Sequence, residues 1–136
     1  MEIVSGEPVF LPATPRRYLQ RLLLQNQFFG DDITLCGILA QGHDLRLVIE
    51  QPHIAGTAPD WTAMNESLIG QYGFKRLSIP PMGHYRSYSY LWEDIGVFDV
   101  HPANCVATAA GILVPIDFIL VRFDAVTVAE LHRRGA

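Results

Sequence analysis

The first regular pattern of apolar residues predicts a helix over residues 15–29. Thr14 offers a capping hydroxyl, and Pro15 presets the φ angle of the first helical position. Gly30 supplies the left-handed conformation that commonly ends a helix. Apolar side chains recur at helical spacing and define the face that we expect to be buried: Tyr18, Leu19, Leu22, Leu23 and Phe29.

A second helix is predicted to begin within residues 57–60, with Pro59 in its first turn, and to end at Gly73. A capping box at residues 127–130 predicts a short third helix near the end of the chain. The large apolar residues of the second helix form a stripe that helical packing alone explains: Trp61, Met64, Leu68 and Tyr72.

Shorter apolar stretches in the first half of the chain predict strands. Residues 33–40 and 45–51 are expected to pair as an antiparallel hairpin that turns at residues 41–44. Residues 9–11, which lie between two prolines, predict an edge strand because proline is tolerated at sheet edges. One face of the hairpin is expected to carry the alternate apolar residues of its second strand: Leu45, Leu47 and Ile49.

In the second half of the chain, apolar and polar residues alternate as they do along the strands of a sheet. Residues 87–92 read as a strand that turns through Glu93 and Asp94 into residues 95–98. Residues 77–85 are interrupted by proline and glycine and predict a loop. Residues 118–123 are apolar enough for a buried strand.

The apolar stretch over residues 96–120 contains three oxygen-bearing side chains, Asp99, Asn104 and Asp117. Residues 95–98 are expected to deliver Asp99 to a loop formed by residues 101–104. Residues 105–108 and 112–120 predict a hairpin that turns at 109–111. The three side chains are therefore expected at strand ends around one small space.

These residue types suit a divalent cation and a proton acceptor. Magnesium prefers carboxylate and amide oxygens and keeps positions free for water and phosphate, which makes Asn104 and Asp117 suitable ligands. Asp99 is then placed to orient or deprotonate a hydroxyl group. The structural alternative is that each residue only caps a turn, because Asp and Asn side chains commonly bond to nearby backbone.

The pattern D-V-H-P-A-N followed by G-I-L-V-P-I-D resembles the protein-kinase-like superfamily. It is most similar to the kinase-type domain of phage and mobile-element polyvalent proteins, with an aminoglycoside-phosphotransferase-like catalytic loop. The resemblance implies an ATP- and Mg²⁺-dependent phosphotransferase with Asp99 as base and with Asn104 and Asp117 as metal ligands. It places His101 opposite the transferred phosphate. It also implies that the backbone of a hinge-like segment contacts adenine: Glu50, Gln51 and Pro52.

Other kinase features are missing from this sequence. Its only lysine, Lys75, follows the hinge-like segment, and no G-x-G-x-x-G run precedes it. The first helix carries no glutamate, and the nearest polar substitutes, Gln25 and Gln27, are expected to face solvent. The chain is therefore expected to be an incomplete phosphotransferase, weakly active or inactive alone. The alternative is a catalytically dead remnant, like a pseudokinase, that binds nucleotide or another protein.

The predicted fold class is α+β, a truncated kinase-like fold in a single domain over residues 1–136. Residues 15–51 form a partial N-lobe-like part with a helix and an antiparallel hairpin. Residues 52–57 form a hinge-like linker, and residues 58–136 form a partial C-lobe-like part with a helix and the catalytic-loop hairpins. Besides a nucleotide, the expected partners are a second copy of the chain or a protein that supplies the missing strands.

Composition limits the remaining function classes. A hydrophobic content of 49% with 18% charged residues is that of a globular protein. A net charge of −4 gives no electrostatic reason to expect nucleic-acid binding. Cys36 and Cys105 lack metal-type spacing and indicate reduced thiols. No secretory signal and no membrane-spanning run is evident, so a cytoplasmic location without membrane contact is expected.

Overall fold

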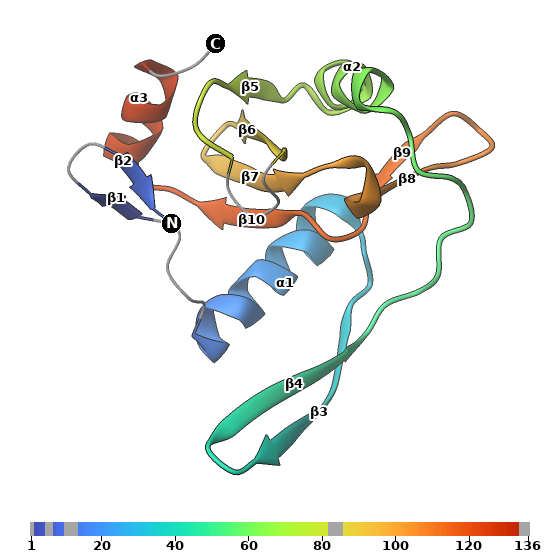
Figure 1. Ribbon diagram of the computed structural model, residues 1–136, viewed down its shortest axis with the longest axis vertical. Helices are drawn as coiled ribbons and strands as arrows, with labels where there is room; N and C mark the ends of the chain where they lie inside the picture. Colours follow the sequence, from blue (N-terminus) through green and yellow to red (C-terminus); the bar gives the residue numbers. More distant parts are fainter. Residues whose placement is uncertain (1, 5–6, 10–13, 82–85, 134–136) are drawn as a thin grey trace. The chain divides into compact units, whose positions relative to one another are not determined.

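The computed structural model of the chain describes residues 2–4, 7–9, 14–81 and 86–133 (Figure 1). The described residues contain three α-helices and four antiparallel sheets, which confirms the α+β class. The chain divides into two compact units, Ala13–Ile54 and Met1–Pro12 with Ala55–Ala136. No helix in the described part of the chain has the length and apolar character needed to cross a membrane.

The smaller unit begins with α1 (Pro15–Phe29), at the predicted bounds. The Thr14 hydroxyl accepts a hydrogen bond from the Arg17 backbone N–H at 3.2 Å, and Gly30 ends the helix in the left-handed region with φ 63°. The predicted buried face was partly wrong. Leu23 is 67% exposed, and Gln25, expected to face solvent, is buried, because the buried stripe is rotated around the helix axis from the apolar pattern.

A long hairpin follows, made of β3 (Thr34–Gln41) and β4 (Asp44–Glu50). The Asn26 side chain joins it to α1, accepting from the Ile33 N–H at 2.7 Å and donating to the Ile33 carbonyl at 3.0 Å. The turn is shorter than predicted, since only Gly42 and His43 lie between the strands. Gly42 has φ 60°, as the first central position of a tight hairpin requires.

Asp31 is a buried acid between α1 and β3. Its carboxylate oxygens have no hydrogen-bond partner in the described part of the chain, and burial raises its pKa from 3.8 to about 7. Between those two pH values the folded chain holds a proton that the unfolded chain releases. The free energy of unfolding therefore falls as the pH rises from 4 to 7.

Asp31→Asn is expected to raise the free energy of unfolding by about 4 kcal/mol at pH 8 and to leave it unchanged at pH 4, since the amide never ionises. Urea unfolding at the two pH values measures the difference. Asp32→Asn is the matched control, because Asp32 is exposed. If both variants raised the free energy of unfolding equally at pH 8, the effect could not come from the buried charge of Asp31.

The larger unit is built around a four-stranded antiparallel sheet in the order β10-β7-β6-β5. Three of its strands confirm the prediction: β6 (Tyr88–Trp92), β7 (Ile95–Val100), which runs two residues past the predicted end, and β10, which lies within the strand predicted over residues 118–123. β5 (Lys75–Leu77) was missed, because it is only three residues long, begins two residues after Gly73, and ends at Leu77, which was assigned to a loop. β10 (Ile119–Arg122) pairs with β7 and does not continue the preceding strand, so the single strand predicted over residues 112–120 was wrong.

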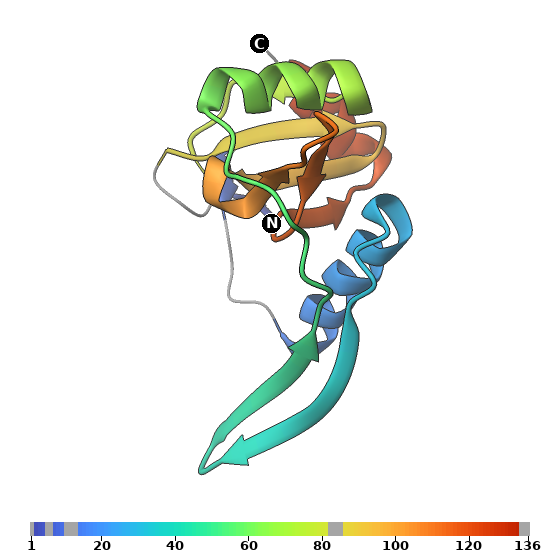
Figure 2. The same cartoon turned by 90° about the vertical axis from the view of Figure 1, so that its right-hand side faces the viewer.

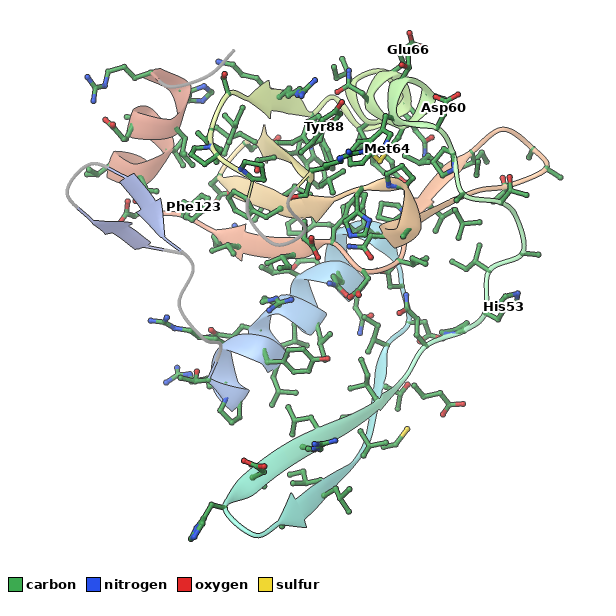
Figure 3. All side chains as sticks on the ribbon, viewed as in Figure 1. His53, Asp60, Met64, Glu66, Tyr88 and Phe123 are labelled. Atoms are coloured by element: carbon green, nitrogen blue, oxygen red, sulfur yellow. The ribbon has the colours of Figure 1, made fainter. Side chains whose placement is uncertain are left out.

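α2 (Trp61–Tyr72) packs against this sheet. Met64 points toward the strands and Glu66 points away from them (Figure 3). The Tyr90 hydroxyl of β6 donates to the Asn65 side chain at 2.6 Å. The helix begins later than predicted, because the Asp60 carboxylate accepts from the Ala63 N–H at 2.7 Å and Pro59 lies before the first turn.

The core of the larger unit joins the sheet to the two helices α2 and α3 (Ala125–Arg133). α3 is capped by Asp124, which accepts from the Thr127 N–H at 2.8 Å, so the predicted capping box at 127–130 lies inside the helix. The largest fully buried side chains come from α2, β6, β7, β10, α3, residues 113–115 and the residue before β10: Met64, Leu68, Tyr90, Ile95, Val97, Phe98, Val100, Leu113, Pro115, Phe118, Leu120 and Leu131.

Three further short elements complete this unit. β8 (Cys105–Ala107) and β9 (Leu113–Pro115) form a small hairpin, preceded by the 3₁₀ helix η1 (Pro102–Asn104). Near the start of the chain, β1 (Glu2–Val4) pairs with β2 (Glu7–Val9). The predicted strand over residues 9–11 therefore meets β2 only at Val9, and Phe10 and Leu11 lie outside the described residues.

Candidate functional site

Asp99 lies inside β7 and not in the loop that follows it. Tyr88 is opposite Val100 and Tyr90 is opposite Val97, so β7 has one more residue than β6 between these pairs. Asp99 itself has φ 56°, in the left-handed region that residues with a Cβ rarely adopt. This β-bulge changes the direction of the Asp99 side chain. Bulges and such backbone conformations are frequent beside functional sites.

Asn104 holds Asp99 in place. Its Nδ2 donates to the Asp99 carbonyl oxygen at 2.8 Å and to the Asp99 carboxylate Oδ2 at 3.2 Å. Both of these Asp99 oxygens are acceptors, so the Asn104 side-chain atom that contacts them is the amide nitrogen. Asn104 is 8% exposed, so these bonds are formed with little competition from water. The tight turn between the two residues is made by η1.

Asn104 also joins the site to Asp117. Its backbone carbonyl accepts from the Ile116 N–H at 2.9 Å and from the Asp117 N–H at 3.3 Å. The end of β9 is thereby fixed against the end of η1. Asp117 is exposed, while the following residue, Phe118, is buried. The structure thus brings the three predicted residues together through one asparagine.

His101 is the fourth predicted site residue and lies between β7 and η1. Its Nε2 lies 3.7 Å from Asp99 Oδ1, and the two side chains are 15% and 22% exposed. They therefore line the same partly open surface. The Asp99 carboxylate faces Asn104 with one oxygen and His101 with the other.

Cys105 directly follows the loop but is not suited to nucleophilic chemistry. Its thiol is buried beneath the carbonyls of His101 and Pro102, at 3.7 and 3.8 Å from Sγ. Burial raises the pKa of this thiol to about 12. The thiolate is the reactive form of cysteine, so the chemistry of the loop rests on its oxygen and imidazole groups.

Gln71 and Tyr72 hold β9 in place, a role that the sequence pattern did not predict. The Gln71 side chain donates to the Leu113 carbonyl and accepts from the Leu113 N–H, both at 3.1 Å. The Tyr72 hydroxyl donates to the same carbonyl at 2.8 Å. The periodicity of α2 marked Tyr72 only as a packing residue and gave no sign of Gln71. These bonds fix β9, the strand that ends two residues before Asp117.

The other strand of the small hairpin, β8, is fixed by the segment before α2. Thr57 and Ala107 exchange two backbone hydrogen bonds, at 3.0 and 2.7 Å. A Cβ on Gly56 would clash with the Ala107 carbonyl oxygen, which explains why a glycine stands here.

The predicted adenine contacts lie in the other compact unit. Glu50 ends β4, and Gln51 and Pro52 follow it without regular structure. Their role stays a prediction. Within the described residues, no group of three or more His, Cys, Asp or Glu side chains could hold a metal ion.

The arrangement is that of a kinase-like domain. It has an aspartate near the end of a strand, an asparagine five positions later and an aspartate after a short hairpin, and hydrogen bonds join the three. Residues 9–122 match the sequence model of the family described as Serine/Threonine/Tyrosine Kinase found in polyvalent proteins, so the chain belongs to this family. No curated protein and no solved structure shows significant similarity to the chain.

Proposed function

We propose that the chain acts as an ATP- and Mg²⁺-dependent phosphotransferase domain whose reacting groups gather around Asn104. The observation that supports this proposal most is the double role of Asn104. Its side chain bonds to Asp99, and its backbone carbonyl bonds to the Asp117 N–H. An asparagine that only formed a turn would bond to nearby backbone, whereas the Asn104 amide also donates to the Asp99 carboxylate.

Asp99 is the proposed proton acceptor. Its Oδ2 accepts from the Asn104 amide, and its Oδ1, which lies on the side of His101, is the proposed acceptor for the proton of an attacking hydroxyl group. The bulge and the left-handed backbone fix the direction of the carboxylate before substrate binds. His101 is the proposed partner for the phosphate, to which a ring N–H can donate.

The residues of the loop fit a magnesium ion by their chemistry. Because Nδ2 of Asn104 is directed at Asp99, its amide oxygen is turned away from Asp99, and it makes no hydrogen bond within the described residues. Asp117 adds an exposed carboxylate. Two oxygen ligands of this kind suffice for Mg²⁺, which keeps its other positions for water and phosphate. When bound, the ion would neutralise the charge on the phosphate oxygens.

The segment after β4 is the proposed contact for adenine. Pro52 has no N–H, so Glu50 and Gln51 must supply any backbone donor, with the carbonyls as acceptors.

Nucleotide binding without phosphate transfer is the second candidate, and Lys75 favours it. This single lysine lies in β5, where its Nζ is 3.2 Å from His132 Nδ1 of α3. It is thus engaged away from the Asp99 loop. Without a lysine on the phosphates, a transition-state contribution of several kcal/mol would be missing.

ATP with Mg²⁺ is expected to raise the midpoint of thermal unfolding by several degrees, since a ligand at a hundred times its dissociation constant stabilises the folded state by about 2.7 kcal/mol. Asp117→Ala is expected to abolish the rise that depends on magnesium. Thermal unfolding with ATP alone and with ATP and Mg²⁺ measures both effects.

Glu66→Ala is the matched control for this experiment, because it removes an equal charge from an exposed position on α2. It should keep the full rise. No rise for the wild-type chain at saturating ATP and Mg²⁺ would refute nucleotide binding. A rise without any transfer of the γ-phosphate to water or protein would select the second candidate.

A further inference from the structure

The β3–β4 hairpin carries an apolar face that remains exposed to solvent. Residues directly opposite each other in an antiparallel pair share a face, and successive residues alternate between faces. The register shifts between Leu35 and Gly37, so that Leu35 lies on the same face as Ile38. Three pairs therefore share one face, and every member is apolar: Leu35 with Ile49, Ile38 with Leu47, and Ala40 with Leu45. Leu35, Ile38 and Leu45 are 45%, 61% and 54% exposed. Exposed apolar surface of this kind commonly marks an interaction site.

The outer edge of β4 is open. The sheet consists of β3 and β4 only, and no other described strand pairs with either (Figure 2). The pair next to a two-residue turn, here Gln41 and Asp44, is hydrogen-bonded, and bonded pairs then alternate along the ladder. The backbone groups of Leu45, Leu47 and Ile49 are therefore directed away from β3, toward the open edge. A hairpin of two strands is marginally stable in water, and additional strands stabilise it.

The sequence of β4 is complementary to itself in the antiparallel direction. It reads Arg46-Leu47-Val48-Ile49-Glu50. When two copies are aligned around Val48, the arginine of each copy lies opposite the glutamate of the other. Leu47 then faces Ile49, and the backbone groups of these two residues are the ones directed to the open edge. The charge pattern and the hydrogen-bonding pattern thus require the same alignment.

Both charged residues are available for this pairing. Arg46 and Glu50 are exposed, and neither forms an ion pair within the described residues. Glu50 accepts only a weak hydrogen bond from the Cys36 thiol, at 3.6 Å, which leaves its charge unneutralised. Edge strands that avoid association usually present charges that repel a second copy. In β4 the charges attract one.

We propose that β4 is a homodimerisation edge at which two copies of the chain pair in antiparallel fashion around Val48. The product is a four-stranded sheet in the order β3-β4-β4-β3, with two Arg46–Glu50 ion pairs between the copies. Its two apolar faces join into one, because Leu47 and Ile49 of both copies lie on the same side. A strand from a different protein could form backbone hydrogen bonds with the edge of β4, but it would not in general place opposite charges against Arg46 and Glu50.

Charge reversal tests this pairing. Arg46→Glu and Glu50→Arg each place like charges opposite each other at two symmetric positions. Each is expected to weaken the dimer about tenfold or more, because opposite charges across strands attract and like charges repel. The double variant Arg46→Glu/Glu50→Arg restores opposite charges and is expected to restore the wild-type dissociation constant. Sedimentation equilibrium of the full chain measures all four proteins.

Arg16→Glu is the matched control for Arg46→Glu, since Arg16 is exposed on α1 and the two substitutions change the net charge equally. Circular dichroism verifies that each variant keeps its folded structure. A wild-type chain that stays monomeric at its highest soluble concentration would overturn the proposal. So would single variants that dimerise as the wild type does, or a double variant that remains as weak as the single ones.

Discussion

Phe98→Ala is expected to lower the free energy of unfolding by about 4 kcal/mol. Phe98 is fully buried in β7, immediately before Asp99, and its ring meets the Phe123 ring edge-on at a centroid distance of 6.0 Å. The space for both rings is provided by Gly96, where a Cβ would clash with each of them. Removing the Phe98 ring leaves a cavity that these neighbours cannot fill without backbone movement.

Urea unfolding followed by circular dichroism measures the loss. Val126→Ala is the control, because Val126 is 80% exposed on α3 and should change the free energy of unfolding by less than about 0.5 kcal/mol. Equal losses in the two variants would show that Phe98 does not have the packing role assigned to it. Because Phe98 and Asp99 are the residues of the bulge, the Phe98 variant is also expected to lose the ATP-dependent rise in the unfolding midpoint.

Asn104→Asp is expected to destabilise the fold by about 2 to 3 kcal/mol at pH 8, although the two side chains have nearly the same shape. The amide nitrogen that bonds to the Asp99 carbonyl and carboxylate is replaced by an oxygen, so acceptors face acceptors at 2.8 and 3.2 Å. Two carboxylates at this distance raise the pKa of at least one of them. Such a carboxyl binds its proton more tightly in the folded chain, so the destabilisation should shrink as the pH falls to 5.

Asn65→Asp is the matched control for that variant. Asn65 uses its side-chain oxygen to accept from the Tyr90 hydroxyl, and a carboxylate keeps this bond. Urea unfolding of both variants at pH 5 and pH 8 should show a large, pH-dependent loss only at residue 104. A loss at residue 104 that is independent of pH would contradict the contact between the two acids.

Features that depend on residues close together in the sequence were predicted best. The bounds of α1 follow from Thr14, Pro15 and Gly30, whose capping geometry depends only on residues a few positions away. The β3–β4 hairpin follows from its alternating apolar residues and its glycine turn. The spacing of Asp99, Asn104 and Asp117 indicated the kinase-like family, which the match over residues 9–122 confirms.

Features that depend on distant residues were missed or misplaced. β10 pairs with β7, about twenty residues earlier, and the apolar run over 112–120 gives no sign of where one strand ends and the next begins. The bulge at Asp99 depends on how β7 pairs with β6, and it directs the Asp99 side chain toward Asn104 of η1. Gln71 contacts Leu113 across the fold, and a polar residue at the end of a helix shows no periodic pattern.

By itself, then, the sequence determined the local elements and the identity of the three oxygen-bearing residues, because capping, turns and spacing are short-range properties of the chain. Only the tertiary structure decided that Asn104 is the residue that joins Asp99 to Asp117, since its hydrogen bonds require β7, η1 and β9 to meet. It also decided that the apolar face of β3 and β4 stays exposed, because burial depends on which surfaces meet in the folded chain and not on the alternation that marks a strand.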